Sequence, residues 1–225
     1  MKNWIRDNKG FLVFLALFGI FRTAVADWNP IPSASMHPNL LEGDVVFVNR
    51  LAYNVKVPLT DIVLKETGEP QRGDIVTFSS PQNGTRLIKR VVALPGDRVE
   101  MHNEQLIING QPAAYADESN GSESISGVGD LAAVRVKERF DNGSQHQIQF
   151  LPQVNARRDF APVTIPAGQY MMLGDNRDNS QDSRYIGLVP RELLIGRAVR
   201  ILASADIKDK WQPRFDRFGK SLASN

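Results

Sequence analysis

Cysteine is absent from this chain of 225 residues, and histidine is scarce. The absence of cysteine excludes thiol catalysis, disulfide bonds and cysteine-ligated metals, and it leaves the redox compartment open. The histidines, His37, His102 and His146, are scattered. His37 is too close to Ser35 along the chain to serve easily as its base, and we expect it at the surface. Two hydrolase patterns are missing as well: there is no Gly-x-Ser-x-Gly, and Pro38 stands where a Ser-x-x-Lys motif beginning at Ser35 needs lysine.

Charge and composition narrow the class of protein further. The net charge is only +2, which argues against a general nucleic-acid-binding protein. Hydrophobic residues make up 42% of the chain, enough for a buried core in one or two domains. The 17 glycines, the 13 prolines and the shortness of the apolar runs favour a mainly β body. There is no internal repeat.

A polar stretch, GDNRDNSQDSRY at residues 174–185, looks at first like a calcium-binding loop. Its spacing is wrong for one. Counted from Asp178, the position that needs a bidentate glutamate is Val189, and counted from Asp175, Arg177 occupies a ligand position. We therefore expect no metal and no cofactor. The aspartates and arginines are expected to form ion pairs, which leaves Ser180 as the residue of interest.

Ser35 and Lys89 are a candidate nucleophile and base. A serine hydroxyl needs a neighbouring base, and lysine is one residue that can act so. Singly, each has a simpler interpretation, because serine near proline is commonly part of a turn and lysine beside arginine is commonly solvated. Lys89, however, has apolar neighbours along the chain, and in a strand it must face away from Arg90. Apolar surroundings lower the pKa of lysine from about 10.4 toward the ~7–8 that a general base needs.

Five segments, in this order, resemble the sequence boxes of bacterial type I signal peptidases. They are IPSASMHPNL (31–40), GDVV (43–46), RGDIV (72–76), IKRVVALPGD (88–97) and GDNRDNSQDSR (174–184). The resemblance extends from the N-terminal hydrophobic segment to about Leu202 and is weakest over residues 101–166, where the chain lacks the cysteines of some relatives. It implies a signal-peptidase-like antiparallel β-sheet catalytic body behind one N-terminal transmembrane helix.

The resemblance also implies roles for the polar residues of these boxes. Ser35 would attack the scissile carbonyl, and Lys89 would act as general base and then as general acid to the leaving amine. Ser33 and the Ser35 backbone N–H would form the oxyanion hole. Ser180 would orient the Lys89 side chain.

Two further roles follow from the same resemblance. An ion pair between Asp182 and Arg184 would hold the polar loop, which is a structural role. Apolar residues in and beside the first and fourth boxes would line pockets for small side chains of the substrate: Ile31, Pro32, Met36, Leu40, Leu87 and Ile88.

The N-terminus predicts a membrane anchor. Basic residues at positions 2, 6 and 9 precede an uncharged run at residues 10–21, and Arg22 follows it. Arg22 can snorkel, so a helix over residues 10–26 can serve as a transmembrane anchor. The positive charges place the N-terminus in the cytoplasm and the catalytic part on the periplasmic side of a bacterial inner membrane, as a single-pass protein. The alternative is a cleaved secretory signal, since Ala24-Val25-Ala26 has the small-x-small form of a cleavage site.

These patterns divide the chain into a cytoplasmic N-terminus (1–9), a transmembrane anchor (10–26), a catalytic β core (27–100 and 167–205), a smaller inserted β region (101–166) and a basic C-terminal tail (206–225). Serine and glycine over residues 118–130 predict an exposed loop. In the tail, Trp211, Phe215, Phe218 and Leu222 recur at helical spacing among basic residues. This pattern suits either a membrane surface or packing on the β body.

Three functions follow as hypotheses. The first is a membrane-anchored Ser–Lys endopeptidase that cleaves signal peptides from exported preproteins. The second is a specialised relative that matures one pilus or conjugation substrate. The third is a membrane-tethered β domain that binds peptides without cutting them, against which the presence of Ser35, Lys89 and Ser180 argues. The expected partners are preproteins and the lipid bilayer, without nucleic acid, and the expected state is a monomer.

Overall fold

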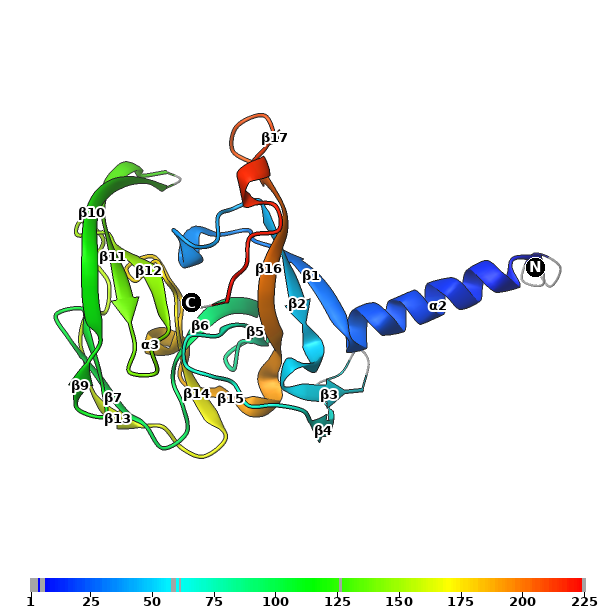
Figure 1. Ribbon diagram of the computed structural model, residues 1–225, viewed down its shortest axis with the longest axis horizontal. Coiled ribbons are helices and arrows are strands. Elements are labelled where there is room, and N and C mark those ends of the chain that lie inside the picture. The colour runs from blue at the N-terminus through cyan, green and yellow to red at the C-terminus, as the bar shows by residue number, and fades with distance from the viewer. Residues whose placement is uncertain (1–3, 5–6, 58–59, 61, 126, 224–225) are drawn as a thin grey trace.

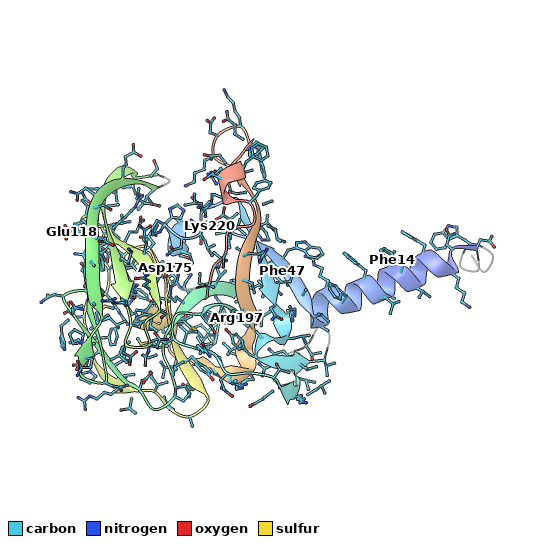
Figure 2. All side chains as sticks on the ribbon, viewed as in Figure 1. Phe14, Phe47, Glu118, Asp175, Arg197 and Lys220 are labelled. Atoms are coloured by element: carbon cyan, nitrogen blue, oxygen red, sulfur yellow. The ribbon has the colours of Figure 1, made fainter. Side chains whose placement is uncertain are left out.

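A helix projects from a β body in the computed structural model, which describes residues 4, 7–57, 60, 62–125 and 127–223. Helix α2 (Lys9–Ala24) extends away from the sheets (Figure 1). Large apolar side chains along it are exposed, and Figure 2 shows Phe14 far from the body. Among the described residues, no helix is both long and apolar enough to cross a membrane.

Helix α2 ends two residues before the expected limit of the anchor. The Val25 N–H donates to the Phe21 carbonyl and closes the last turn. Strand β1 (Ala26–Pro30) then begins, and Ala26 pairs with Asn49 in the sheet. The expected helix through residue 26 is wrong at this end, because the backbone of Ala26 is paired within the sheet instead of within a helix.

The body is built on an antiparallel sheet in the order β1–β2–β16–β5–β6–β14–β15, with β17 paired to β16. Successive residues of its central strands supply cores on opposite faces: Ile75 packs in one cluster and Val76 in another. The predicted mainly β, antiparallel class is confirmed. The bounds of the strands not yet given are β2 (Asp44–Asn49), β5 (Ile75–Ser79), β6 (Arg86–Ala93), β14 (Gln169–Leu173), β15 (Val189–Pro190), β16 (Leu194–Asp206) and β17 (Gln212–Pro213).

Smaller antiparallel sheets complete the described part of the chain. Two of them lie on the side of the body away from α2 (Figure 1) and contain β7 to β13. One has the order β13–β7–β8–β9, with β7 (Arg98–His102), β8 (Gln105–Ile108), β9 (Gln111–Pro112) and β13 (Phe160–Thr164). The other has the order β10–β11–β12, with β10 (Ala114–Ile125), β11 (Gly129–Arg139) and β12 (Gln145–Phe150). A third pairs β3 (Asn54–Lys56) with β4 (Val63–Glu66).

Residues 118–130 do not form the loop that their composition predicted. Most of them belong to the β10–β11 hairpin, whose register continues to the pair Ile125–Gly129. Both faces of the β10 end of the hairpin are largely exposed, so an alternation of apolar and polar residues is not required there. Pairing of the backbone with β11 satisfies the hydrogen-bonding groups that a loop would leave to water.

The C-terminal tail packs on the main sheet at several residues and is exposed at others. Leu222 is buried in the same core cluster as Met36, whereas Trp211 and Phe215 are 70% and 74% exposed. Arg217 Nε donates to the buried Asp44 carboxylate at 2.9 Å. Short helices lie between the strands, except η4, which follows β17: η1 (Ala34–Met36), η2 (Arg50–Ala52), α3 (Ser183–Ile186), η3 (Arg191–Leu193) and η4 (Phe215–Arg217).

Candidate active site

Ser35 lies in the short helix η1, which follows the extended segment after strand β1. The neighbouring Met36 and Leu40 are fully buried in the core and hold this segment against the body. Its start is tied to β2, because Ile31 N–H donates to the Asp44 carbonyl at 2.8 Å. Ser35 itself is 9% exposed, so its hydroxyl stands at the edge of solvent on a fixed backbone.

Lys89 meets Ser35 from strand β6. Its Nζ donates to Ser35 Oγ at 2.7 Å and to the Ile88 carbonyl at 2.9 Å. The next residue, Arg90, faces the other side of the strand, where Nε and Nη2 donate to the two oxygens of Asp175 at 2.8 and 2.7 Å. The two adjacent cations therefore have separate partners, as the alternation of a strand requires.

The environment of Lys89 shifts its protonation equilibrium toward the neutral amine. The side chain is almost fully buried, and burial lowers its pKa from 10.5 to about 8, against the opposing charges of Asp182 and Asp175. A lysine with this pKa is deprotonated in a useful fraction near neutral pH, which an exposed lysine is not. The arrangement can therefore remove a proton from the Ser35 hydroxyl.

Two other serines lie at the same site. Ser33 Oγ is 3.4 Å from Ser35 Oγ. Ser180 is buried in the loop after β14, and its Oγ has no hydrogen-bond partner within the described part of the chain. It lines the same cleft as Ser35 and Lys89, although the hydrogen bond from Ser180 to Lys89 that the resemblance implied is not formed here.

Gly174 leaves the space that Ser180 and Ser35 occupy. A Cβ at this position would lie 2.5 Å from the Ser35 carbonyl oxygen and would overlap the Ser180 side chain. Since backbone atoms cannot move aside as a flexible side chain can, only glycine fits here. The close approach of the polar loop to the Ser35 backbone depends on this residue.

Asp182 and Arg184 shape the polar loop from within. Arg184 Nε and Nη2 each donate to the Asp182 carboxylate at 2.8 Å. The same carboxylate accepts from the Gly174 N–H at 3.0 Å and caps helix α3 through the Arg184 N–H. The Asp182 carboxylate thus connects Gly174, at the start of the loop, with Arg184, at its end.

Comparisons with known proteins show the family of the chain. The family model for signal peptidase, peptidase S26, matches residues 1–203. A signal peptidase I from Pseudomonas aeruginosa is 36% identical over 96% of this chain and 78% of its own length. One from Aquifex aeolicus is 34% identical over 88% of this chain and 83% of its own length. The chain belongs to the signal peptidase I family.

A solved signal peptidase I from Enterococcus faecalis is also similar to this chain, at 31% identity over 57% of this chain and 96% of that one, with a TM-score of 0.34. The family match confirms the resemblance noted in the sequence. The chain is therefore a serine-type signal peptidase. Within the described ranges, no cluster of three or more histidine or acidic residues could hold a metal ion.

Residues that the sequence did not single out hold the segment that carries Ser35. Asn176 N–H donates to the Ser35 carbonyl at 3.2 Å, and its Nδ2 donates to the Ala34 carbonyl at 3.1 Å. Asp175, at the junction of the inserted region and the main sheet (Figure 2), accepts from Asn39 Nδ2 at 2.7 Å. Both residues belong to the fifth box, so their place in a box was the signal that could have identified them.

A cleft of about 530 Å³ opens beside Ser35 and Lys89. Of the six residues expected to line substrate pockets, Pro32 and Leu87 line this cleft. The other four lie behind it, because their apolar side chains pack in the core beneath the segment that carries Ser35: Ile31, Met36 and Leu40 are buried there, and Ile88 packs against them.

His37 is not the surface residue that we expected. Its side chain is 13% exposed, and Nδ1 lies 2.8 Å from an oxygen of Glu123, which is 4% exposed. Glu123 belongs to strand β10 of the inserted region. The sequence showed only that His37 is near Ser35, and the fold supplies the partner that allows the ring to be buried.

Proposed function

We propose that this signal peptidase removes signal peptides from exported preproteins with Ser35 as the nucleophile and Lys89 as the general base. The observation that supports these roles is the 2.7 Å contact between Lys89 Nζ and Ser35 Oγ. The lowered pKa of Lys89 supports them as well, since a protonated lysine has no lone pair to accept the hydroxyl proton.

The chemistry proceeds in two halves. The neutral Lys89 amine takes the Ser35 proton while Oγ forms a bond to the scissile carbonyl carbon, and the carbonyl electrons move to its oxygen. The resulting ammonium gives its proton to the leaving amine as the C–N bond breaks, which leaves an ester on Ser35. Water then attacks the ester carbonyl while Lys89 accepts a proton from it, and the Lys89 ammonium returns that proton to Ser35 Oγ as the ester C–O bond breaks.

Three groups are proposed to assist these steps. The Ser35 N–H and the Ser33 hydroxyl would donate to the oxyanion, which needs donors at the place where negative charge develops. Ser33 is exposed and its Oγ is 3.4 Å from Ser35 Oγ, so it can turn toward a bound substrate. Ser180 would orient the Lys89 amine, and its buried hydroxyl without a partner is available for that contact.

We further propose that helix α2 attaches the enzyme to the inner membrane, with residues 1–9 in the cytoplasm and the catalytic body (27–100 and 167–205), the insertion (101–166) and the tail (206–225) on the other side. The support is the row of exposed apolar side chains on α2, including Phe11, Phe14 and Leu17. Strand β1 connects this helix directly to the segment that carries Ser35. A substrate held at the bilayer would meet the site at a high effective concentration.

The substrate is proposed to carry small residues at the first and third positions before the cut. Pro32 and Leu87 line the cleft, and Ile31, Met36, Leu40 and Ile88 fill the space behind them. A wall of packed, branched side chains leaves shallow depressions, which exclude bulky side chains by overlap and separate alanine from glycine only weakly.

One experiment tests the function and the dyad together. The purified protein is incubated with a preprotein in detergent, and the products are mapped by mass. We expect a single cut between the signal peptide and the mature protein, and none with Ser35→Ala. An uncut preprotein, or a cut that persists in Ser35→Ala, would exclude the proposed function as stated.

A further inference from the structure

The β10–β11 hairpin extends from the inserted region toward residues 31–40, which carry the proposed nucleophile Ser35. Figure 1 shows its closed end (green) bending toward the part of the chain that precedes β2 (blue). Most residues of β10 are exposed, whereas Glu123 near this end is 4% exposed. A carboxylate is buried only at a cost unless a partner compensates it, so the hairpin end must be held by that partner.

The partner is His37, two residues after Ser35. Its Nδ1 lies 2.8 and 3.0 Å from the two Glu123 oxygens. Gln149 Nε2 donates to the same carboxylate at 3.0 Å. Burial acts to raise the pKa of Glu123, but the hydrogen bonds from His37 and Gln149 outweigh it and hold this pKa below its usual value. The carboxylate is therefore charged and bound on two sides.

These contacts belong to a continuous series of hydrogen bonds and chain segments that begins and ends at Glu123 and passes through Ser35. The Gln149 backbone pairs with the polar loop on either side of Asn176, and the Asn176 N–H donates to the Ser35 carbonyl. From Ser35 the chain continues to His37, and the His37 ring contacts the Glu123 carboxylate. The inserted region thus contacts the segment that carries Ser35 directly through His37 and indirectly through Asn176, and these contacts set the position of the hairpin end relative to Ser35.

The two residues after Glu123 reach the cleft. Ser124 and Ile125 line the same cavity of about 530 Å³ as Ser35 and Lys89. We propose that the end of the hairpin is a clamp on the substrate: Ile125 packs on an apolar side chain of the bound peptide, and the His37–Glu123 pair positions it there. This inference rests on the proposed function, because it takes the occupant of the cleft to be the peptide substrate.

A matched pair of variants tests the clamp. Ile125→Ser removes the apolar contact, and Val128→Ser makes the same kind of change at an exposed residue in the same turn that does not line the cleft. With a purified preprotein, we expect Ile125→Ser to raise KM about tenfold, or ~1.4 kcal/mol, with kcat unchanged. Val128→Ser should leave both constants as in the wild type.

The positioning role of Glu123 has its own readout. Glu123→Gln keeps the size of the side chain but removes the charge that His37 faces, so KM should rise by about tenfold, as for the loss of one hydrogen bond to a charged group. If Glu123 acts through Ile125, the variant that combines Glu123→Gln with Ile125→Ser should be no worse than Ile125→Ser alone. A merely structural residue would lower the melting temperature and add its effect to that of Ile125→Ser.

The outcomes separate the clamp from the peptidase. Cleavage by the wild-type protein tests the proposed function, and the ratio of KM values between Ile125→Ser and Val128→Ser tests the clamp. Equal KM values for these two variants, on a preprotein that the wild type cuts, would overturn the clamp and leave the peptidase intact. A fall in kcat with KM unchanged in Ile125→Ser would also overturn it, because the hairpin would then support the nucleophile and not the substrate.

Discussion

Replacing Lys89 by methionine should abolish cleavage and make the folded protein more stable at neutral pH. Burial lowers the pKa of Lys89 from 10.5 to about 8, and at about 1.4 kcal/mol per pKa unit the buried ammonium costs the folded state about 3 kcal/mol below pH 8. Methionine has a similar length, carries no charge and removes this cost. It also loses the bonds to Ser35 and Ile88, each worth about 1 kcal/mol net. The expected gain is therefore about 1 kcal/mol.

The sign of the pH dependence follows from the two pKa values of Lys89. The folded protein releases this proton near pH 8, whereas an unfolded chain with the ordinary value of 10.5 retains it. Between these values the unfolded state binds more protons, so wild-type stability rises with pH. The advantage of Lys89→Met should be complete below about pH 8, and it should shrink and then reverse as pH approaches 10.5. Urea unfolding of both proteins at a series of pH values measures this difference.

A control variant shows whether the stability change comes from removing a buried charge or from removing any lysine charge. Lys65→Met removes a lysine that is exposed on strand β4, and its stability should follow that of the wild type at each pH. The comparison uses the difference between two proteins, so the titration of all other groups cancels. A Lys89→Met protein that is less stable than the wild type at pH 7, or a stability difference that does not change between pH 7 and pH 10, would show that burial of the Lys89 ammonium does not cost stability.

Three further predictions concern turnover. The ratio kcat/KM should rise with pH through an apparent pKa near 8 as Lys89 loses its proton. Ser35→Ala and Lys89→Arg should both be inactive, the latter because a guanidinium stays protonated. Turnover of a preprotein by Lys89→Arg, or a rate that still climbs at pH 10, would contradict these roles. Ser180→Ala should lower kcat about tenfold with little change in KM, as for one lost hydrogen bond to a charged group; an altered KM alone speaks against an orienting role. Gly174→Ala should lower both turnover and the melting temperature, since its Cβ would meet Ser35 and Ser180 atoms; wild-type values in both assays would show that the loop can move.

Much of the candidate site followed from short segments of sequence. The order of the boxes predicted the family, which the comparisons confirm. The alternation of a strand predicted that Lys89 and Arg90 face opposite ways, and in the structure they contact Ser35 and Asp175 respectively. These inferences succeed because each depends on residue types at fixed spacing, and strand geometry is the same wherever the strand lies in the fold.

Other features could not be read from local patterns. The polar hairpin at residues 118–130 has no apolar alternation, since its faces are mainly solvated, so composition alone predicted a loop. His37 was assigned to the surface because its partner, Glu123, is 86 residues away. Four apolar residues of the first and fourth boxes were expected in the lining of the cleft, but packing against the main sheet places them behind it.

By itself, the sequence determined the family and the mainly β class, and it identified Ser35 and Lys89 as the candidate reacting side chains. Only the tertiary structure decided whether these two side chains meet. Lys89 and Ser35 are 54 residues apart, and their contact exists because strand β6 and the segment after β1 are brought together by the main sheet. The pKa of Lys89 has the same origin, since the loss of water depends on everything that packs around the amine and not on its neighbours in the chain.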